Sequence, residues 1–185
     1  SRALMGSRFP AVRVVALSEN RGFTGGNNAG VAAARGDVLV FFNNDMRVEP
    51  DAVRRLVEAL DARHPCAAAR VLSWDGRRID FVRGTISFEA RGFQEHYGDA
   101  VRPELSAAGE SFFPNGGAFA VTREAYERAG GFDDRFFAYY DDIDLGWGVR
   151  LAGGHVRVVP EAVVYHRHGA TSSLQPRGQK RFLME

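Results

Sequence analysis

Three aspartates in the stretch Asp141-Asp142-Ile143-Asp144 form a close group of side chains able to do acid–base chemistry. The pattern predicts a helix from about Asp141 to Ala152, with the carboxylates at the N-terminal end, where the helix dipole stabilises negative charge. At helical spacing Asp141 and Asp144 share a face, and Asp142 points elsewhere. One aspartate can therefore cap the helix while another faces a cleft and acts as a general base. Acidic neighbours would raise the pKa of that base, and a bound cation would lower it. Capping alone is the alternative interpretation.

Another carboxylate, Asp45, follows the uninterrupted apolar run Val38–Phe42 and the amides Asn43 and Asn44. Such a run, with glycine before it and proline after it, predicts a strand buried on both faces, as in the middle of a parallel sheet. Ligands of open α/β sheets bind beyond the carboxyl ends of the strands. A carboxylate there can hold Mg²⁺ or Mn²⁺ together with a phosphate. A turn closed by Asn and Asp side chains is the alternative.

His166 and His168 follow a predicted strand near the end of the chain. A neutral imidazole can ligate a metal, whereas a histidine with satisfied hydrogen bonds, in the core or at the surface, is the simpler interpretation. The other histidines, His64, His96 and His155, have no such context and are interpreted as structural.

The composition indicates one globular domain without a general affinity for nucleic acid. The 185 residues are 45% hydrophobic and 25% charged, with a formal net charge of +1. The single cysteine, Cys66, excludes an internal disulfide and fits a reducing compartment. No apolar run approaches the about 18 residues of a membrane span. We therefore expect a cytoplasmic location, which includes the inner face of the membrane.

The elements that position these residues are predicted from hydrophobic spacing. Val12–Leu17 indicates a strand, Ser18–Asn28 a polar glycine-rich loop and Ala29–Arg35 a short helix. With the strand Val38–Phe42 they would form a βαβ unit with a right-handed crossover. The glycines of the loop would let the backbone approach a ligand, and a flexible turn is the alternative.

Further elements follow the same logic. A helix begins near Pro50, and its buried face is marked by Val53, Leu56, Val57 and Leu60. Thr122 is expected to cap a second helix, over residues 123–129. Strands are expected over residues 67–72 and in the segment after the glycine pair that ends at Val121. Two short strands, over residues 156–159 and 162–165, are expected on either side of Pro160. Residues 79–110 are expected to form a long connection with short strands at most, a place where an acceptor can be chosen.

Taken together, these segments resemble the family 2 glycosyltransferases, which have the GT-A fold. Each motif alone is weak, but their order and spacing are specific, and the similarity extends from about residue 9 to residue 173. The subgroup that the chain resembles is the bacterial rhamnosyltransferase-like enzymes of cell-surface polysaccharide assembly. The motifs are Glu19-Asn20-Arg21-Gly22-Phe23, Gly25-Gly26-Asn27-Asn28-Ala29-Gly30, Phe42-Asn43-Asn44-Asp45, Gly130-Gly131-Phe132-Asp133-Asp134, Phe136-Phe137-Ala138-Tyr139, Asp141-Asp142-Ile143-Asp144-Leu145, Gly153-Gly154, Pro160 and His166.

The resemblance implies transfer of a sugar, with inversion, from a nucleoside-diphosphate donor such as a UDP- or dTDP-sugar. The acceptor would be a hydroxyl of a carbohydrate or lipid-linked glycan. Asn43-Asn44-Asp45 stands where the family has its DXD-type motif, so Asp45 would bind the Mg²⁺ or Mn²⁺ that bridges the donor diphosphate. Asp142 would be the general base. His166, or alternatively His168, would complete metal or diphosphate binding.

The resemblance also implies that the loop lies near the nucleotide, through Asn20, Gly22, Gly26 and Asn27. The implied fold is an α/β, Rossmann-like, three-layer GT-A sandwich with a mostly parallel central sheet. Residues 1–185 are expected to be a single, partial domain, N-terminally truncated because nothing matches the family's first strand and base-binding loop. We therefore expect weak or no donor binding by this chain alone.

Two further departures refine the expectation. Gly148 stands where many relatives have arginine, so a contact to acceptor or diphosphate is lost or supplied by Arg150. The Gln-x-x-Arg-Trp motif of processive synthases is missing, which favours an enzyme that adds a single sugar.

Other functions are kept as alternatives. They are a sugar-phosphate nucleotidyltransferase, a catalytically incompetent fragment, and a domain that binds a carbohydrate or a partner protein. No nucleic acid partner is expected, and membrane association is expected only peripherally, through regions outside this chain.

Overall fold

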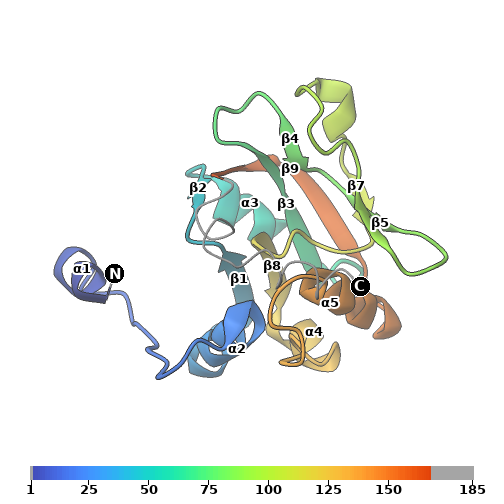
Figure 1. Cartoon of the computed structure of the whole chain (residues 1–185). Coiled ribbons are helices and arrows are strands. Elements are labelled where there is room, and N and C mark those ends of the chain that lie inside the picture. The colour runs from blue at the N-terminus through green and yellow to red at the C-terminus, as the bar shows by residue number, and fades with distance from the viewer. Residues whose placement is uncertain (1, 168–185) are drawn as a thin grey trace, which may run out of the picture.

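The computed structural model describes residues 2–167, built around one mixed sheet (Figure 1). The helices are α1 (Arg2–Arg8), α2 (Gly22–Ala33), α3 (Ala52–Glu58), α4 (Arg123–Arg128) and α5 (Asp141–Leu151), with a 3₁₀ turn at Pro103–Ser106. The strands are β1 (Val38–Phe42), β2 (Met46–Val48), β3 (Cys66–Ser73), β4 (Ile79–Phe81), β5 (Gly84–Ile86), β6 (Gly92–Gln94), β7 (Gly109–Ser111), β8 (Ala118–Thr122) and β9 (Val156–His166).

The main sheet has the strand order β1-β8-β3-β9-β2, with β4 beside β3 and β7 beside β9. β3 and β9 run parallel, whereas every other pairing among the described strands is antiparallel. The α/β class is confirmed, but the expectation of a mostly parallel sheet is wrong. The reason is that β8 lies between β1 and β3 and runs opposite to both.

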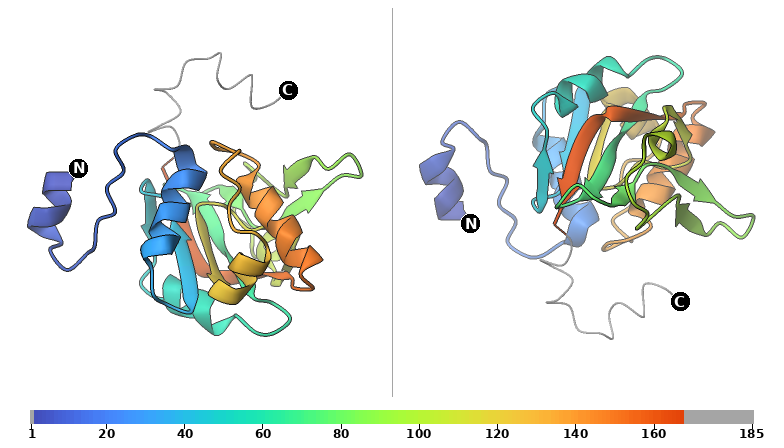
Figure 2. Two further views of the ribbon diagram at one scale, coloured as in Figure 1. Left: turned by 90° about the horizontal axis from the view of Figure 1, so that it is seen from below. Right: turned by 90° about the horizontal axis from the view of Figure 1, so that it is seen from above.

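The segment Val12–Leu17 is not a strand, so the predicted βαβ unit does not form. Alternating apolar residues favour an extended backbone, but a strand also needs a neighbour for its hydrogen bonds. This segment finds none among the described residues. Val12 is 52% exposed and Leu17 is 39% exposed. Figures 1 and 2 show this connection running outside the body of the molecule, with α1 at its far end.

Helix α2 begins at Gly22, within the stretch predicted to be a loop. Glycines weaken a helix by themselves, so contacts from outside it must stabilise this one. The Phe23 N–H donates to the Phe137 carbonyl at 2.7 Å, and the Thr24 hydroxyl donates to the Phe136 carbonyl. A side chain at Gly22 would collide with Phe137. These contacts join α2 to Phe136 and Phe137, in the segment that leads into α5.

β1 is confirmed as a strand, but it lies at one end of the strand order, not in the middle of a parallel sheet. Its side chains alternate between buried and half-buried, as expected for a strand paired with β8 on one side. Phe41 stacks on Phe119 at 4.6 Å between ring centres and meets Phe132 edge-on at 5.4 Å. This aromatic cluster joins β1 and β8 to the segment after α4.

The two strands predicted around Pro160 are one continuous strand, β9. Its register with β3 shifts between Ala69 and Arg70, which pair with Val159 and Val163. Such a bulge accommodates a proline that cannot donate to the ladder. The strand can therefore run on to His166.

The helices pack against the sheet in two groups. Figures 1 and 2 show α2, α4 and α5 together on one side, and α3 packs against β9, β3 and β8. In α3, Leu56 is buried as predicted, but Val53 and Val57 are exposed, because Ala52 takes the other core-facing position. Within residues 2–167, no helix combines the length and the apolar character needed to cross a membrane.

The start of α4 and the contact between α4 and α5 follow from single residues. The Thr122 hydroxyl accepts from the Ala125 N–H at 3.2 Å, which confirms the predicted cap. At Gly148, a Cβ atom would lie 2.6 Å from the Ala129 carbonyl oxygen. The two helices therefore pack at a distance that leaves no room for a side chain at position 148.

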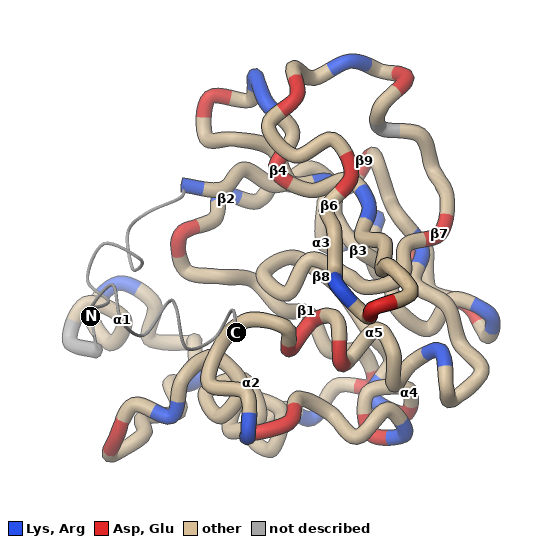
Figure 3. The backbone as a smooth tube through the Cα atoms, turned by 45° about the vertical axis from the view of Figure 1, so that its right-hand side comes forward, with Lys and Arg blue, Asp and Glu red and all other residues tan. Residues whose placement is uncertain are grey.

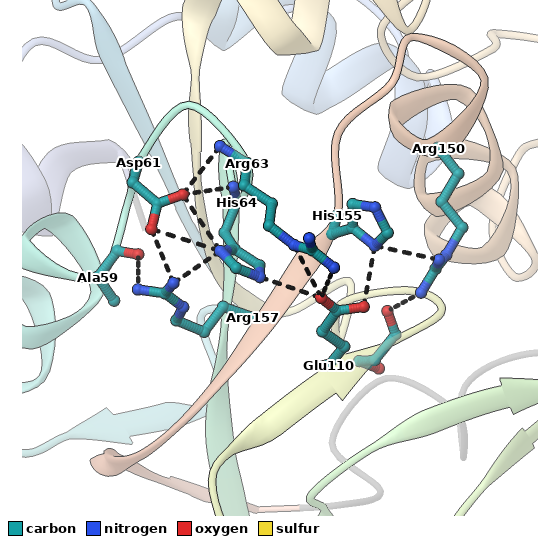
Figure 4. A network of polar contacts seen from close by, with 9 residues as sticks. Ala59, Asp61, Arg63, His64, Glu110, Arg150, His155 and Arg157 are labelled. Carbon is teal, nitrogen blue, oxygen red and sulfur yellow. Dashed lines mark hydrogen bonds and ion pairs between the residues drawn. The ribbon is translucent and has the colours of Figure 1, made fainter.

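A polar network holds α5, β7 and β9 at the other end of the sheet (Figure 4). Glu110 accepts from His64 at 3.2 Å and from His155 at 2.9 Å, and the His64 contact is the main reason that the pKa of Glu110 falls to about 2. Arg150 donates to the Ser111 carbonyl at 2.9 Å and stacks over Phe112. Arg150 thus joins α5 to the end of β7 and the segment that follows it. His64 and His155 have the structural roles predicted for them.

Candidate active site

Asp45 and His166 meet at one corner of the sheet. β1 ends at Phe42, a turn closed by the Met46 N–H and the Asn43 carbonyl at 3.2 Å follows, and β2 then pairs with the end of β9. Because Met46 is opposite His166 in this register, the Asp45 carboxylate lies 3.4 Å from His166 Nε2. Both side chains are largely buried, with 18% and 17% of their surface exposed. Asn44, beside them, is exposed.

Asp80 on β4 completes this corner and was missed from the sequence. His166 Nδ1 donates to the Asp80 carboxylate at 2.7 Å, and this bond is the main cause of the raised pKa of His166. The bond directs Nε2 toward Asp45. The signal in the sequence was a lone carboxylate between Ile79 and Phe81, since an ionised group at a buried strand position needs a partner.

Two glycines connect the Asp45 corner to the acidic start of α5. The Asn43 N–H donates to the Gly117 carbonyl at 3.0 Å, and the Gly116 N–H donates to Asp142 Oδ2 at 3.3 Å. A Cβ at Gly117 would lie 2.5 Å from Nδ2 of the Asn43 side chain. The turn before β8 therefore lies against both Asn43 and Asp142, and side chains here would separate them.

The three aspartates of α5 have different environments. Asp141 is buried and Asp144 is exposed, although helical spacing places the two side chains on the same face of α5. Asp142 is half-buried and accepts from the N–H groups of Gly116 and Ile143. Burial raises the pKa of Asp142 to about 6. At Asp141, burial and then the charge of Asp142 raise the pKa to about 7.

The backbone just before α5 is strained. Tyr139 and Tyr140 have φ angles of 73° and 64°, in the left-handed region that residues with a side chain rarely adopt. Each such residue costs on the order of 1 kcal/mol. The contacts of α2 with Phe136 and Phe137 hold the segment on the N-terminal side of this turn.

The residues predicted to lie near a nucleotide are placed in and before α2. Asn20 accepts from the Gly22 N–H at 3.0 Å, and Asn27 donates to the Phe23 carbonyl at 2.9 Å. Gly26 faces open space. None of these contacts reaches Asp45 or His166. His168, the alternative to His166, lies outside the described residues.

The donor atoms of the Asp45–His166 pair fit a divalent cation that also binds phosphate groups. The pair offers one carboxylate oxygen and one imidazole nitrogen, and Asp80 orients the imidazole, as carboxylates orient histidines at many metal centres. Across residues 2–167, no group of three or more His, Cys, Asp or Glu side chains is arranged to hold a metal by itself. Mg²⁺ and Mn²⁺ commonly take one or two protein ligands and complete their shell with substrate phosphates and water.

Comparison with known proteins gives the family. Residues 3–182 match the sequence profile described as glycosyltransferase like family 2. The chain is 27% identical over 194 aligned positions to the N-acetylglucosaminyl-diphospho-decaprenol L-rhamnosyltransferase of Mycobacterium tuberculosis, covering 91% of the chain and 63% of that protein. It is 42% identical over 73 residues to the succinoglycan biosynthesis protein ExoO of Rhizobium meliloti, covering 38% of the chain and 21% of that protein. The chain thus spans less than two thirds of both relatives.

Solved structures give the fold. GalNAc-T7, determined with UDP, GalNAc and Mn²⁺, superposes with a TM-score of 0.71 at 18% identity, over 90% of the chain and 34% of that protein. The mannosyltransferase PcManGT from Pyrobaculum calidifontis, in complex with GDP-Man and Mn²⁺, gives 0.63 at 16% identity, over 91% and 44%. Both are GT-A glycosyltransferases, so the GT-A expectation is confirmed.

Proposed function

The chain belongs to glycosyltransferase family 2, and we propose that it is a single, partial GT-A domain that transfers a sugar, with inversion, from a nucleoside-diphosphate donor to an acceptor hydroxyl. The observation that carries this proposal is the arrangement of Asp45, His166 and Asp142 around one glycine turn. Family membership also favours glycosyl transfer over nucleotidyl transfer.

The donor diphosphate would be held at the Asp45–His166 corner. Asp45 and His166 would ligate Mg²⁺ or Mn²⁺, and the ion would offset the charge of the departing nucleoside diphosphate. The two structural neighbours were determined with UDP or GDP-Man and Mn²⁺, which supports a nucleotide-sugar donor. A UDP- or dTDP-sugar remains the proposed donor. Asn20, Gly22, Gly26, Asn27 and Asn44 stay our candidates for contacts to the nucleotide.

Asp142 would remove the proton from the acceptor hydroxyl. With a pKa of about 6, its carboxylate is mostly ionised at neutral pH and still basic enough to accept a proton. The N–H groups of Gly116 and Ile143 fix its orientation. Attack by the activated hydroxyl on the sugar face opposite the diphosphate gives inversion.

The acceptor and the setting are proposed from the relatives. One relative is named for a diphospho-decaprenol acceptor and another for succinoglycan biosynthesis. We therefore propose a carbohydrate or lipid-linked glycan acceptor, a role in cell-surface polysaccharide synthesis and a cytoplasmic location. A domain that only binds carbohydrate is the competing function.

Turnover of nucleotide sugars by the full natural protein tests the proposal. We expect Mn²⁺-dependent release of UDP or dTDP, measured by chromatography. Asp142→Asn should lower turnover by about 10² to 10⁴-fold with nucleotide affinity unchanged, as expected for loss of a general base. Asp144→Asn, two residues further along at an exposed position, is the matched control and should keep full activity. Equal turnover by Asp142→Asn and the wild type would refute the assignment of the base, and binding without turnover would favour the carbohydrate-binding domain.

A further inference from the structure

A second cluster of charged side chains lies at the same corner of the sheet and has no part in the chemistry above. We call it the arginine–aromatic patch, and it consists of Arg47, Trp74, Tyr165 and Arg167. The Arg47 guanidinium carbon lies 4.2 Å from the centre of the Tyr165 ring and 4.8 Å from that of Trp74. The Arg167 guanidinium lies 5.9 Å from the Trp74 ring. Figure 3 shows basic positions beside β2 at this corner.

The patch lies on the opposite face of the sheet from His166. Arg47 pairs with Tyr165 and Met46 pairs with His166 in the β2–β9 register, and successive side chains of a strand point to opposite faces. The contacts agree with this geometry, because the Met46 methyl lies against Gly117 on the active-site side and the Tyr165 ring lies beside Gly76. The patch is therefore separate from the place proposed for the donor diphosphate.

The guanidinium groups of Arg47 and Arg167 are exposed. Among residues 2–167, no carboxylate lies within ion-pairing distance of Arg47 or Arg167. The neighbouring carboxylate, Asp75, instead accepts from the Ser73 hydroxyl at 2.6 Å and the Arg77 N–H at 3.1 Å. Arg77 and Arg78 add exposed positive charge to the same turn. This corner is therefore a local site of positive charge on a chain whose formal net charge is only +1.

The arrangement suits phosphate groups at an apolar boundary. A guanidinium stacked flat on rings keeps its N–H edge available, and that edge matches the oxygens of a phosphate. The Trp74 ring is 42% exposed. A soluble anion would leave this ring in water, whereas a lipid surface covers both the ring and the charges, as tryptophan and basic residues at membrane interfaces show. We propose that the arginine–aromatic patch binds the phosphate groups of an anionic membrane surface.

Sedimentation with lipid vesicles tests this inference without any sugar transfer, so its outcome is independent of the proposed enzyme activity. The protein should sediment with phosphatidylcholine vesicles that contain phosphatidylglycerol and stay in solution with phosphatidylcholine alone. Arg47→Gln and Arg167→Gln should each weaken binding about fivefold, the factor that corresponds to about 1 kcal/mol for a basic residue near a charged membrane. Arg47→Lys keeps the charge but loses the flat stacking, and should bind between the wild type and Arg47→Gln.

Arg54→Gln is the matched control, because it removes the same charge from an exposed arginine that is paired with Asp51 and Glu58. It should leave vesicle binding unchanged. Thermal unfolding followed by circular dichroism checks that each variant is folded. Equal sedimentation with neutral vesicles, or equal effects of Arg54→Gln and Arg47→Gln, would overturn the proposal.

Discussion

Replacing Asp141 by asparagine should make the protein more stable at alkaline pH. Asp141 is 6% exposed, and burial together with the charge of Asp142 raises its pKa from 3.8 to about 7. Above pH 7 the folded protein must hold a buried, ionised carboxylate that the unfolded chain holds in water. Asparagine keeps a side-chain oxygen for hydrogen bonds and removes the charge.

The size and sign follow from proton linkage. A shift of about 3 pKa units at about 1.4 kcal/mol per unit gives a penalty of about 4 kcal/mol, fully present above the folded pKa of about 7. The penalty decreases as the pH falls from 7 toward 3.8, because the folded state takes up a proton in this range while the unfolded carboxylate is still ionised. The stabilisation by Asp141→Asn should therefore be about 4 kcal/mol at pH 8.5 and about 1 kcal/mol at pH 4.5.

Urea unfolding at these two pH values, followed by circular dichroism, measures the difference. At pH 8.5 the gain corresponds to a rise in melting temperature of about 8 to 16 °C for a domain of this size. Asp144→Asn, on the exposed side of the same helical turn, is the control and should change stability by less than about 0.5 kcal/mol. The same gain at both pH values, or a loss at pH 8.5, would refute the idea that ionisation of Asp141 opposes folding.

Three further predictions concern the active site and the packing of the helices. The transfer rate should fall as the pH decreases below about 6, where Asp142 becomes protonated, and a rate profile without an acid limb would contradict its role as base. Asp80→Asn should weaken Mn²⁺ binding about 10 to 100-fold in titration calorimetry because His166 loses its orienting partner; unchanged affinity would show that His166 is not a ligand. Gly148→Ala should cost about 1 to 3 kcal/mol in urea unfolding, since its Cβ would press on the Ala129 carbonyl. Its control, Gly30→Ala in the open surroundings of α2, should gain about 0.5 to 1 kcal/mol, and equal effects of the two would exclude the close contact between α4 and α5.

Features that depend on local patterns could be predicted from the sequence. The strand β1, the cap at Thr122 and the helix that begins at Asp141 all appear where the residues indicate them. Each rests on neighbouring residues: an apolar run, a hydroxyl before a helix, or carboxylates in a first turn. The approach of Asp45 to His166 was expected only through the resemblance to the family, and the structure places the pair together.

Features that depend on distant partners could not be predicted in this way. The apolar spacing of Val12–Leu17 is that of a strand, but nothing in the segment says whether a neighbouring strand is present. The direction of β8 relative to β1 is set by how the chain folds back, which leaves no periodic signal. Asp80 lies in a stretch that looks irregular from sequence, and its value comes from a contact with His166, 86 positions along the chain. The roles of Asp45, Asp142 and His166 in the chemistry remain predictions.

The position of β1 at the end of the strand order has a consequence for how the protein behaves in solution. Among the described residues, β8 is the strand that pairs with β1, so the other edge of Val38–Phe42 keeps backbone groups available for a further strand. The five residues of β1 are all apolar, without the charge or proline that usually discourages edge-to-edge pairing. This edge is therefore one at which a further strand would extend the sheet.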